Sequence, residues 1–205
     1  MLLRLQPSRP RPLPADLPWS QTIRCPRRWP HRAAPHDWSG FYVGLSYGRT
    51  ASSEIVDTTL GPVYRLSKGS VSVLNLGYLA QRNQFVFGGE LSYLNYNDVI
   101  MAGLAGYHMD KTIDLKGRLG VAANKDLFYG ALGYSTGTFT VDPLAASYKP
   151  KGASYGLGVE YAATQRLIIG VEYLARKMQA DGPTALVSDI DVNLNTLSLR
   201  VGLSL

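Results

Sequence analysis

The stretch "DWSGFYVGLSYGRT", residues 37–50, decides the fold because its residues alternate in character along the chain. One set of alternating positions is large and apolar, and the other set is mostly small or polar. The first set is Phe41, Val43, Leu45 and Tyr47, and the second is Tyr42, Gly44, Ser46 and Gly48. Successive side chains of a β-strand point to opposite faces, so this period of two predicts a strand with one apolar face.

The same alternation recurs further along the chain. It is found in "LNLGYLA" (74–80), "FVFGGELSY" (85–93), "IDLKGRLGV" (113–121), "FYGALGYST" (128–136), "YGLGVEYA" (155–162), "LIIGVEYLAR" (167–176) and "TLSLRVGLSL" (196–205). With the opening stretch, these segments predict eight strands.

The connections between the predicted strands alternate in length. Short polar turns are expected at "QRNQ" (81–84), "ANKD" (123–126) and "ATQR" (163–166), and longer connections at roughly 50–70, 96–111, 138–152 and 178–193. Short turns at one end, long connections at the other and an even strand number are typical of an up-and-down barrel. We therefore predict an all-β fold, an eight-stranded antiparallel barrel over residues 38–205.

The charged residues indicate which face of this barrel points inward. All charged side chains of the predicted strands lie on the small, polar face: Glu90, Asp114, Lys116, Arg118, Glu160, Glu172, Arg176 and Arg200. In a soluble, lipocalin-like barrel this face would meet water and would normally carry more Lys and Glu. Small residues suit the crowded interior of a narrow barrel. The pattern favours a transmembrane barrel whose lumen holds these charges as a neutral network.

Aromatic residues on the apolar face gather near both ends of the predicted strands. Near the short turns lie Phe41, Tyr78, Phe85, Phe87, Phe128 and Tyr161, and near the long connections lie Tyr47, Tyr93, Tyr134, Tyr155 and Tyr173. Aromatic rings prefer the two headgroup layers of a membrane, so the positions predict two belts. Ordinary enrichment of aromatics in strands explains their number but not this clustering.

Four segments carry a resemblance to a known family. "WSGFYVGLSYG", "FVFGGELSY", "LKGRLGVAAN" and "NTLSLRVGL" resemble the small eight-stranded outer-membrane proteins of proteobacteria, the porin-family or opacity-like surface antigens with an OmpA-type barrel. The resemblance covers about residues 38–205. It implies a Gram-negative cell-envelope protein with periplasmic termini, surrounded by outer-membrane lipids and inserted by the barrel-assembly machinery. Such barrels usually end in an aromatic residue, whereas Leu205 stands here.

Residues 1–37 differ in composition from the rest. Eight of the twelve prolines and all three tryptophans precede Ser39, and all 21 glycines follow it. The first 38 residues carry seven arginines and two acids, while the remainder carries 14 basic and 13 acidic residues. The basic character therefore belongs mainly to this segment and does not indicate a nucleic-acid partner. We predict a disordered Pro/Arg-rich tail.

The tail also lacks the apolar core of a signal peptide. "AAPHDWSG" nevertheless looks like the junction after a cleavage site, which favours a misassigned gene start in place of a signal peptide. A genuine periplasmic extension and a mitochondrial transit peptide are the alternatives, and prolines argue against the amphipathic helix of the latter.

No catalytic, cofactor or metal site is predicted. The predicted barrel has a single histidine, His108, with Asp110 nearby in a long connection, and no Ser/His pair at a strand end. One cysteine, Cys25, excludes an internal disulfide. We expect a non-enzymatic envelope protein with exposed loops, whose ligand the sequence does not name, and a largely plugged lumen. A narrow porin-like channel is the alternative; a soluble ligand-binding barrel and a lipid-modifying barrel enzyme are further ones.

Overall fold

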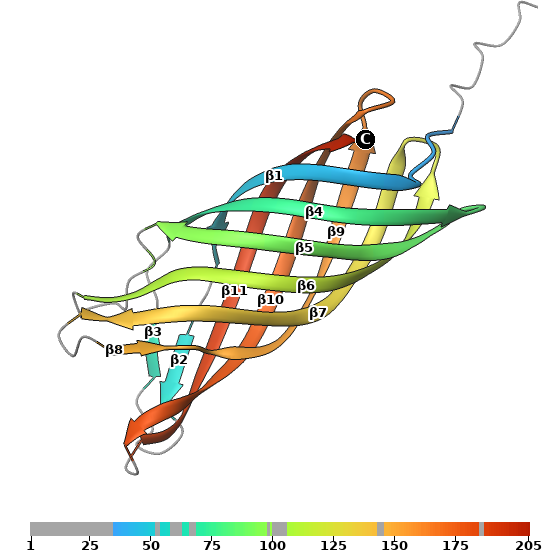
Figure 1. Ribbon diagram of the computed structural model, residues 1–205. Coiled ribbons are helices and arrows are strands. Elements are labelled where there is room, and N and C mark those ends of the chain that lie inside the picture. Colours follow the sequence, from blue (N-terminus) through green and yellow to red (C-terminus); the bar gives the residue numbers. More distant parts are fainter. Residues whose placement is uncertain are drawn as a thin grey trace, which may run out of the picture. The chain divides into compact units, whose positions relative to one another are not determined.

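The computed structural model describes residues 35–51, 54–57, 63–65, 69–97, 99, 106–142, 146–184 and 187–205. These residues form eleven β-strands and no α-helix (Figure 1). The strands are β1 (Gly40–Thr50), β2 (Glu54–Asp57), β3 (Val63–Arg65), β4 (Ser70–Arg82), β5 (Phe85–Asn97), β6 (Tyr107–Ala123), β7 (Asp126–Val141), β8 (Ala146–Tyr148), β9 (Lys151–Ala162), β10 (Leu167–Thr184) and β11 (Val187–Ser204).

Of the predicted tail, residues 1–37, the part up to residue 34 lies outside the described residues. Within the described ranges, no helix is long and apolar enough to cross a membrane.

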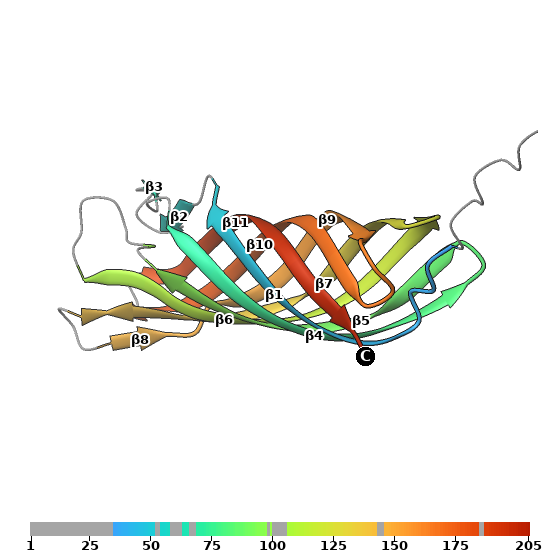
Figure 2. The same cartoon turned by 90° about the horizontal axis from the view of Figure 1, so that it is seen from above.

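Eight of the described strands close into a barrel (Figures 1 and 2). Pairing runs in the order β1-β4-β5-β6-β7-β9-β10-β11, and β11 pairs back with β1, antiparallel throughout. The closing seam extends from Tyr42 opposite Ser204 to Thr50 opposite Thr196. Closure pairs the backbone groups of every wall strand, which a sheet surrounded by lipid requires. The predicted eight-stranded up-and-down barrel is confirmed.

One end of the barrel, here called the short-turn end, carries the three predicted tight turns. Asn83 and Asn124 have positive φ angles of 57° and 61°. The short polar side chain of Asn tolerates this left-handed conformation, and such turns match the twist of the strands they join. In the third turn, the Thr164 hydroxyl accepts hydrogen bonds from the N–H groups of Arg166 (3.2 Å) and Leu167 (2.9 Å).

At the opposite end, called the extended end, the strands run further than the sequence predicted. β10 continues to Thr184 and β11 begins at Val187, so the prediction of a connection over 178–193 is wrong. β7 continues to Val141 and is followed by β8, which shortens the connection predicted at 138–152. β8 pairs with β7 in the register that β9 continues, so β8 and β9 follow one line along β7.

The other two long connections also contain strand. β2 and β3 lie within the predicted connection 50–70, and β6 begins at Tyr107 within 96–111. β2 pairs with the extended part of β11 beyond the point where β1 ends. The extended end is therefore largely β-structure in the described ranges.

The reason for this difference is that the polarity of the two faces reverses along the strands. On β10, Val171 and Tyr173 are exposed on the outer face, while Glu172 is buried on the inner face. Further along the same strand the outer face carries Lys177, which is exposed, and the inner face carries Met178, which is buried. The alternation of side chains continues, but the apolar residues now lie on the inner face. Because the prediction required apolar residues on the outer face, it ended the strand too early.

Candidate functional site in the barrel lumen

The eight predicted charged residues all point into the lumen. Glu90 lies on β5, Asp114, Lys116 and Arg118 on β6, Glu160 on β9, Glu172 and Arg176 on β10, and Arg200 on β11. Each is at most 7% exposed. Their even spacing along each strand places them on the inner face. Four carboxylates and four cations give the described lumen a balanced charge.

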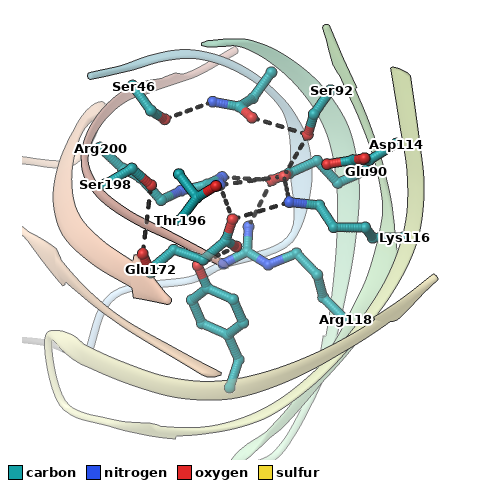
Figure 3. A network of polar contacts seen from close by, with 12 residues as sticks. Ser46, Glu90, Ser92, Asp114, Lys116, Arg118, Glu172, Thr196, Ser198 and Arg200 are labelled. Carbon is teal, nitrogen blue, oxygen red and sulfur yellow. Dashed lines mark hydrogen bonds and ion pairs between the residues drawn. The ribbon is translucent and has the colours of Figure 1, made fainter. Parts of the chain in front are cut away.

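Glu90 is the centre of the larger group (Figure 3). Its carboxylate lies 2.8 Å from Nζ of Lys116 and 3.2 Å from a guanidinium nitrogen of Arg118, and it also contacts the guanidinium of Arg200. Glu90 stands directly opposite Lys116 in the β5–β6 register, so the backbone sets this pair. The Tyr42 hydroxyl donates a 2.6 Å hydrogen bond to the same carboxylate. Glu90 thus meets three cations.

Two further carboxylates complete the group from the other side of the lumen. Glu160 lies 2.8 Å from Arg118 and 3.2 Å from Arg200. Glu172 lies 2.9 Å from Nζ of Lys116 and 3.2 Å from Arg200. Every cation of this group therefore contacts two or more carboxylates. The contacts cross the lumen and connect β5 and β6 with β9, β10 and β11, so that the walls of the barrel are joined through its centre.

Asp114 and Arg176 form a separate pair nearer the extended end. Their closest contact, between Nη2 and Oδ2, is 2.7 Å, and Nε of Arg176 lies 3.1 Å from Oδ1. The Ser135 hydroxyl donates to Asp114 at 2.6 Å, and Arg176 donates to the Thr196 hydroxyl at 2.9 Å. Bidentate geometry with further hydrogen bonds is the arrangement in which a buried ion pair recovers its desolvation cost.

Tyr42 and Tyr129 are buried on the inner face, and the sequence reasoning assigned neither of them a role in the charge network. Each lies over a glycine on the neighbouring strand: Tyr42 is opposite Gly77, and Tyr129 is opposite Gly158. A Cβ atom on Gly77 would lie 2.4 Å from the Tyr42 hydroxyl, and one on Gly158 would lie 2.3 Å from Cζ of Tyr129. An aromatic residue on the polar face facing a glycine across the strands was the signal available in the sequence.

These tyrosines act as partners of the charges. The Tyr129 hydroxyl donates to Glu172 at 2.9 Å. The guanidinium carbon of Arg118 lies 3.7 Å from the Tyr129 ring centroid and 5.5 Å from that of Tyr42. Aromatic faces attract cations strongly where water is excluded. The two rings therefore hold Arg118 in the centre of the lumen.

A line of uncharged polar groups extends the network. The Ser92 hydroxyl lies 3.0 Å from the Glu90 carboxylate and 2.9 Å from the Asn75 carbonyl oxygen. The Asn75 amide donates in turn to the Ser46 hydroxyl at 2.7 Å. Figure 3 shows this line reaching from Ser92 to Ser46 on β1. It connects the Glu90 carboxylate to the strand that closes the barrel.

Apolar side chains lie inside the barrel on both sides of the charges, which the sequence reasoning did not predict. The cluster at the short-turn end contains Trp38, Tyr42, Leu79, Val86, Leu127, Tyr129, Ala131, Ala162, Ile168 and Leu174. The cluster at the extended end contains Val71, Val73, Leu94, Tyr96, Val99, Met109, Phe139, Met178, Val192 and Leu194. The charged layer is therefore enclosed between two apolar layers.

One small cavity adjoins the charged layer. A cavity of about 20 Å³ lies beside it, lined among others by Tyr42, Asn75, Glu160 and Arg200. A cavity of roughly 10–15 Å³ is the minimum that holds one water molecule. This cavity therefore has room for about one water and not for a continuous column.

Residues just before β1 cover the lumen at the short-turn end. Trp38 is 3% exposed, and its backbone N–H donates to Oε1 of Gln81 at 2.8 Å. The ring of His36 packs edge-on against Trp38 with 4.8 Å between centroids. The backbone N–H of His36 donates to the backbone carbonyl of Asn124 at 3.1 Å. Burial lowers the pKa of His36, which favours its neutral form. These contacts begin inside the predicted tail, at residue 36.

The eleven aromatic residues of the predicted belts all lie on the outer face and are 42–60% exposed. The register sets Phe41 opposite Tyr78, and their rings meet edge to face at 4.8 Å. Between the two sets the outer face of the described strands carries no charged residue. Beyond the tyrosines at the extended end, the outer face becomes polar. The apolar band is therefore bounded at both ends by aromatic side chains.

His108 and Asp110, the histidine and acid singled out in the sequence, lie on β6 outside this band. Nε2 of His108 is 3.0 Å from Asp110, and Nδ1 is 3.7 Å from Asp142. Within the described ranges, no group of three or more His, Cys, Asp or Glu side chains could hold a metal ion. The structure thus brings His108 and Asp110 together as a partly exposed pair.

A closed barrel with an apolar outer band and a charged, packed lumen is the architecture of a transmembrane β-barrel. The family model of the outer membrane protein beta-barrel domain matches residues 31–204. The chain belongs to this family, and it is a small eight-stranded outer-membrane barrel protein of the Gram-negative cell envelope.

Solved structures with a similar fold come from several bacteria. Neisserial surface protein A (NspA) aligns with a TM-score of 0.53 at 17% identity, covering 82% of this chain and 98% of that one. OprG from Pseudomonas aeruginosa gives 0.49 at 15% identity, covering 83% and 98%. Ail, the attachment invasion locus protein of Yersinia pestis, gives 0.47 at 16% identity, covering 80% and 99%. Comparison with curated protein sequences found no match.

Proposed function

We propose that this protein is a non-enzymatic structural and surface protein of the outer membrane, with a closed lumen that does not conduct ions. Its barrel is a rigid anchor, and the exposed segments at the extended end carry whatever binding specificity the protein has, as loops on rigid scaffolds generally do. The observation that carries the proposal is the charge network enclosed between two apolar clusters.

The packing of the lumen supports closure over a narrow channel. An ion path would have to pass two apolar layers and a layer in which the described cations contact carboxylates. The cavity of about 20 Å³ offers space for a single water. Apolar constrictions oppose ion passage because they exclude water.

We further propose that the short-turn end faces the periplasm and the extended end faces the exterior. Short turns are periplasmic in barrels of this kind. The C-terminal Leu205 lies at the short-turn end, where its N–H donates to the carbonyl of Phe41 at 2.9 Å. Outer-membrane lipids and the barrel-assembly machinery are the partners expected for such a chain, and no nucleic acid is expected.

Planar-bilayer recordings test the proposal. The protein is first refolded into lipid vesicles, and insertion is verified by protection of the barrel from trypsin. With insertion shown, we expect no stable conductance above the protein-free bilayer. A large and long-lived open state would overturn the closed lumen in favour of the narrow channel. Incubation with outer-membrane lipids, followed by mass spectrometry, tests the other part: new acylated or deacylated lipids would show an enzyme.

A further inference from the structure

The short segment before β1 is tied to all three turns at the short-turn end. The backbone N–H of Trp38 donates to Oε1 of Gln81 at the end of β4, which leads into the first turn. The backbone N–H of His36 donates to the carbonyl of Asn124 in the second turn. In the third turn, the side chain of Gln165 is a hydrogen-bond partner of the His36 side chain. The segment therefore joins turns that are far apart in the sequence.

We call residues 36–39 of this segment the latch. Figure 1 shows the chain before β1 running beside the turn between β6 and β7. The latch passes into β1 at Gly40, whose φ angle of 132° lies in a region that favours glycine. Its large apolar side chain, Trp38, is buried in the apolar cluster at the short-turn end. The latch thus closes over that cluster and is connected to the wall through a glycine.

His36 is the buried titratable side chain of the latch. It is 4% exposed, and its ring packs against the ring of Trp38. Its Nε2 atom has no hydrogen-bond partner among the described residues. A protonated imidazole carries a proton on both ring nitrogens, so charging His36 in place would bury an N–H group without an acceptor. The closed latch therefore suits the neutral ring and opposes the charged one.

The groups around His36 do not reverse this preference. Burial has the largest influence and lowers the pKa of His36, and the charge of Lys125 in the second turn acts in the same direction. The hydrogen bond of Gln165 and the charge of Asp37 act against it, with a smaller effect than burial. Asp37 accepts a 2.9 Å hydrogen bond from the N–H of Ser39, which lowers the pKa of Asp37 and keeps it charged while His36 titrates.

We propose that the latch is an acid-sensitive lid of the barrel, which stays closed while His36 is neutral and is released when His36 takes up a proton. Release withdraws Trp38 and exposes the apolar cluster at the short-turn end to water. The charge network beyond this cluster is held by the wall strands and stays in place. With the short-turn end in the periplasm, as proposed above, the latch responds to the pH of that compartment.

The direction of the pH dependence follows from proton uptake by the released latch. A released His36 titrates near the ordinary histidine pKa of about 6.5, whereas the closed latch lowers the pKa of His36. Above about pH 6.5 the ring is neutral in both forms, and the latch stays closed. Below this pH the released form takes up the proton first. The ratio of released to closed latch then rises by up to about tenfold per pH unit, until the pH reaches the lowered pKa.

The fluorescence of Trp38 tests the proposal in the full chain. The variant Trp19→Phe/Trp29→Phe leaves Trp38 as the single tryptophan. Its quenching by acrylamide, which is uncharged, is followed in detergent micelles from about pH 8 to about pH 5. We expect weak, constant quenching above about pH 6.5 and a reversible increase below it. Strand content, followed by circular dichroism, should not change over the same range.

Two variants in this background identify the titrating group. His36→Gln is neutral at every pH and should abolish the pH dependence of quenching. The matched control, His31→Gln/His108→Gln, leaves His36 as the single histidine and should preserve it.

Four results would each overturn the proposal. They are quenching that does not change with pH, an unaltered pH dependence in His36→Gln, loss of the pH dependence in the control, and a parallel loss of strand content, which would mean that acid unfolds the barrel itself. Because both ends of the barrel are accessible in micelles, none of these results depends on the conductance of the lumen or on the orientation in the membrane.

Discussion

Glu90 illustrates how a residue in this lumen depends on its neighbours. It is 1% exposed and meets Lys116, Arg118 and Arg200, so its charge is compensated by cations from two strands. Removing one partner from a buried ion network leaves the others uncompensated, which costs more than the network itself contributes. The lumen therefore tolerates its charges only as a complete set.

Glu90→Gln should destabilise the barrel by about 3–5 kcal/mol because it leaves the described network with one more cation than carboxylates. The measurement is urea-induced unfolding in lipid vesicles. Asn97→Ala, an exposed position on the same strand, is the control and should change stability by less than about 0.5 kcal/mol. Similar unfolding midpoints for the two variants would show that the network is not needed for stability.

Gly158 tests the placement of Tyr129. An alanine Cβ there would lie 2.3 Å from Cζ of the tyrosine, so Gly158→Ala forces the ring away from Arg118 and Glu172. We expect a loss of about 1–3 kcal/mol, the usual cost of overpacking. At Gly130 the nearest atoms would be 3.9 Å from the new Cβ, so Gly130→Ala is the control. Equal stability of the two variants would mean that Tyr129 does not lie over Gly158.

The strands were predicted correctly in their central parts and too short at the extended end. The alternation found β1 and the central parts of the other wall strands because lipid outside and a polar lumen inside impose opposite demands on neighbouring residues. The alternation did not predict strand beyond the tyrosines at the extended end, where β10 and β11 continue with Met178 and Leu194 turned inward. There the outer face meets water, so the same period carries the opposite polarity.

The charged residues of the lumen could be predicted by position but not by partner. Side-chain periodicity places Asp114 and Lys116 on one face, yet the pairing of Asp114 with Arg176 across the barrel depends on strand tilt and stagger, which no single strand encodes. The two apolar clusters were missed for a related reason, since Leu79 and Ile168 break the polar pattern singly on different strands and meet only in the closed barrel.

Leu194 tests the reversed polarity of β11. The side chain is 0% exposed within the apolar cluster at the extended end, so Leu194→Ala should cost about 2–5 kcal/mol through lost burial and a cavity. The adjacent Asn193 lies on the outer face, and Asn193→Ala should change stability by less than about 0.5 kcal/mol. Chemical denaturation in vesicles compares them. A larger effect at Asn193 would place the faces of this segment the other way round.

At the scale of the whole described structure, residues 35–205 with their gaps form a single barrel whose wall, lumen and short-turn end are joined by contacts between distant parts of the chain. Trp38 and His36 contribute to it although they precede the first strand. The boundary of the folded unit therefore lies close to residue 36, and the part of the predicted tail before residue 35 is outside the described structure.

Two deletions locate this boundary. A chain lacking residues 1–34 should refold with unchanged stability, because the described contacts begin at His36. A chain lacking residues 1–38 loses Trp38 from the short-turn cluster and should be less stable by about 3–5 kcal/mol. Refolding into micelles, followed by circular dichroism and protease resistance, gives the comparison. A barrel that fails to fold without residues 1–34 would contradict the predicted domain boundary.

The central claim is that the apolar outer face of the barrel meets lipid and the charged face lines the lumen. It is tested most directly by the stability of Val171→Arg in lipid bilayers. Val171 lies on the outer face of β10 between the aromatic belts, opposite Val159 and Leu199. A cation placed there should cost about 2–4 kcal/mol, the range for the lipid face near the midplane. Gln179→Arg, on the same face of the same strand beyond the tyrosines, should cost about 0–1 kcal/mol. If both variants unfold like the unmodified protein, the outer face does not meet lipid, and the assignment of a membrane-spanning barrel with an inward charge network is contradicted.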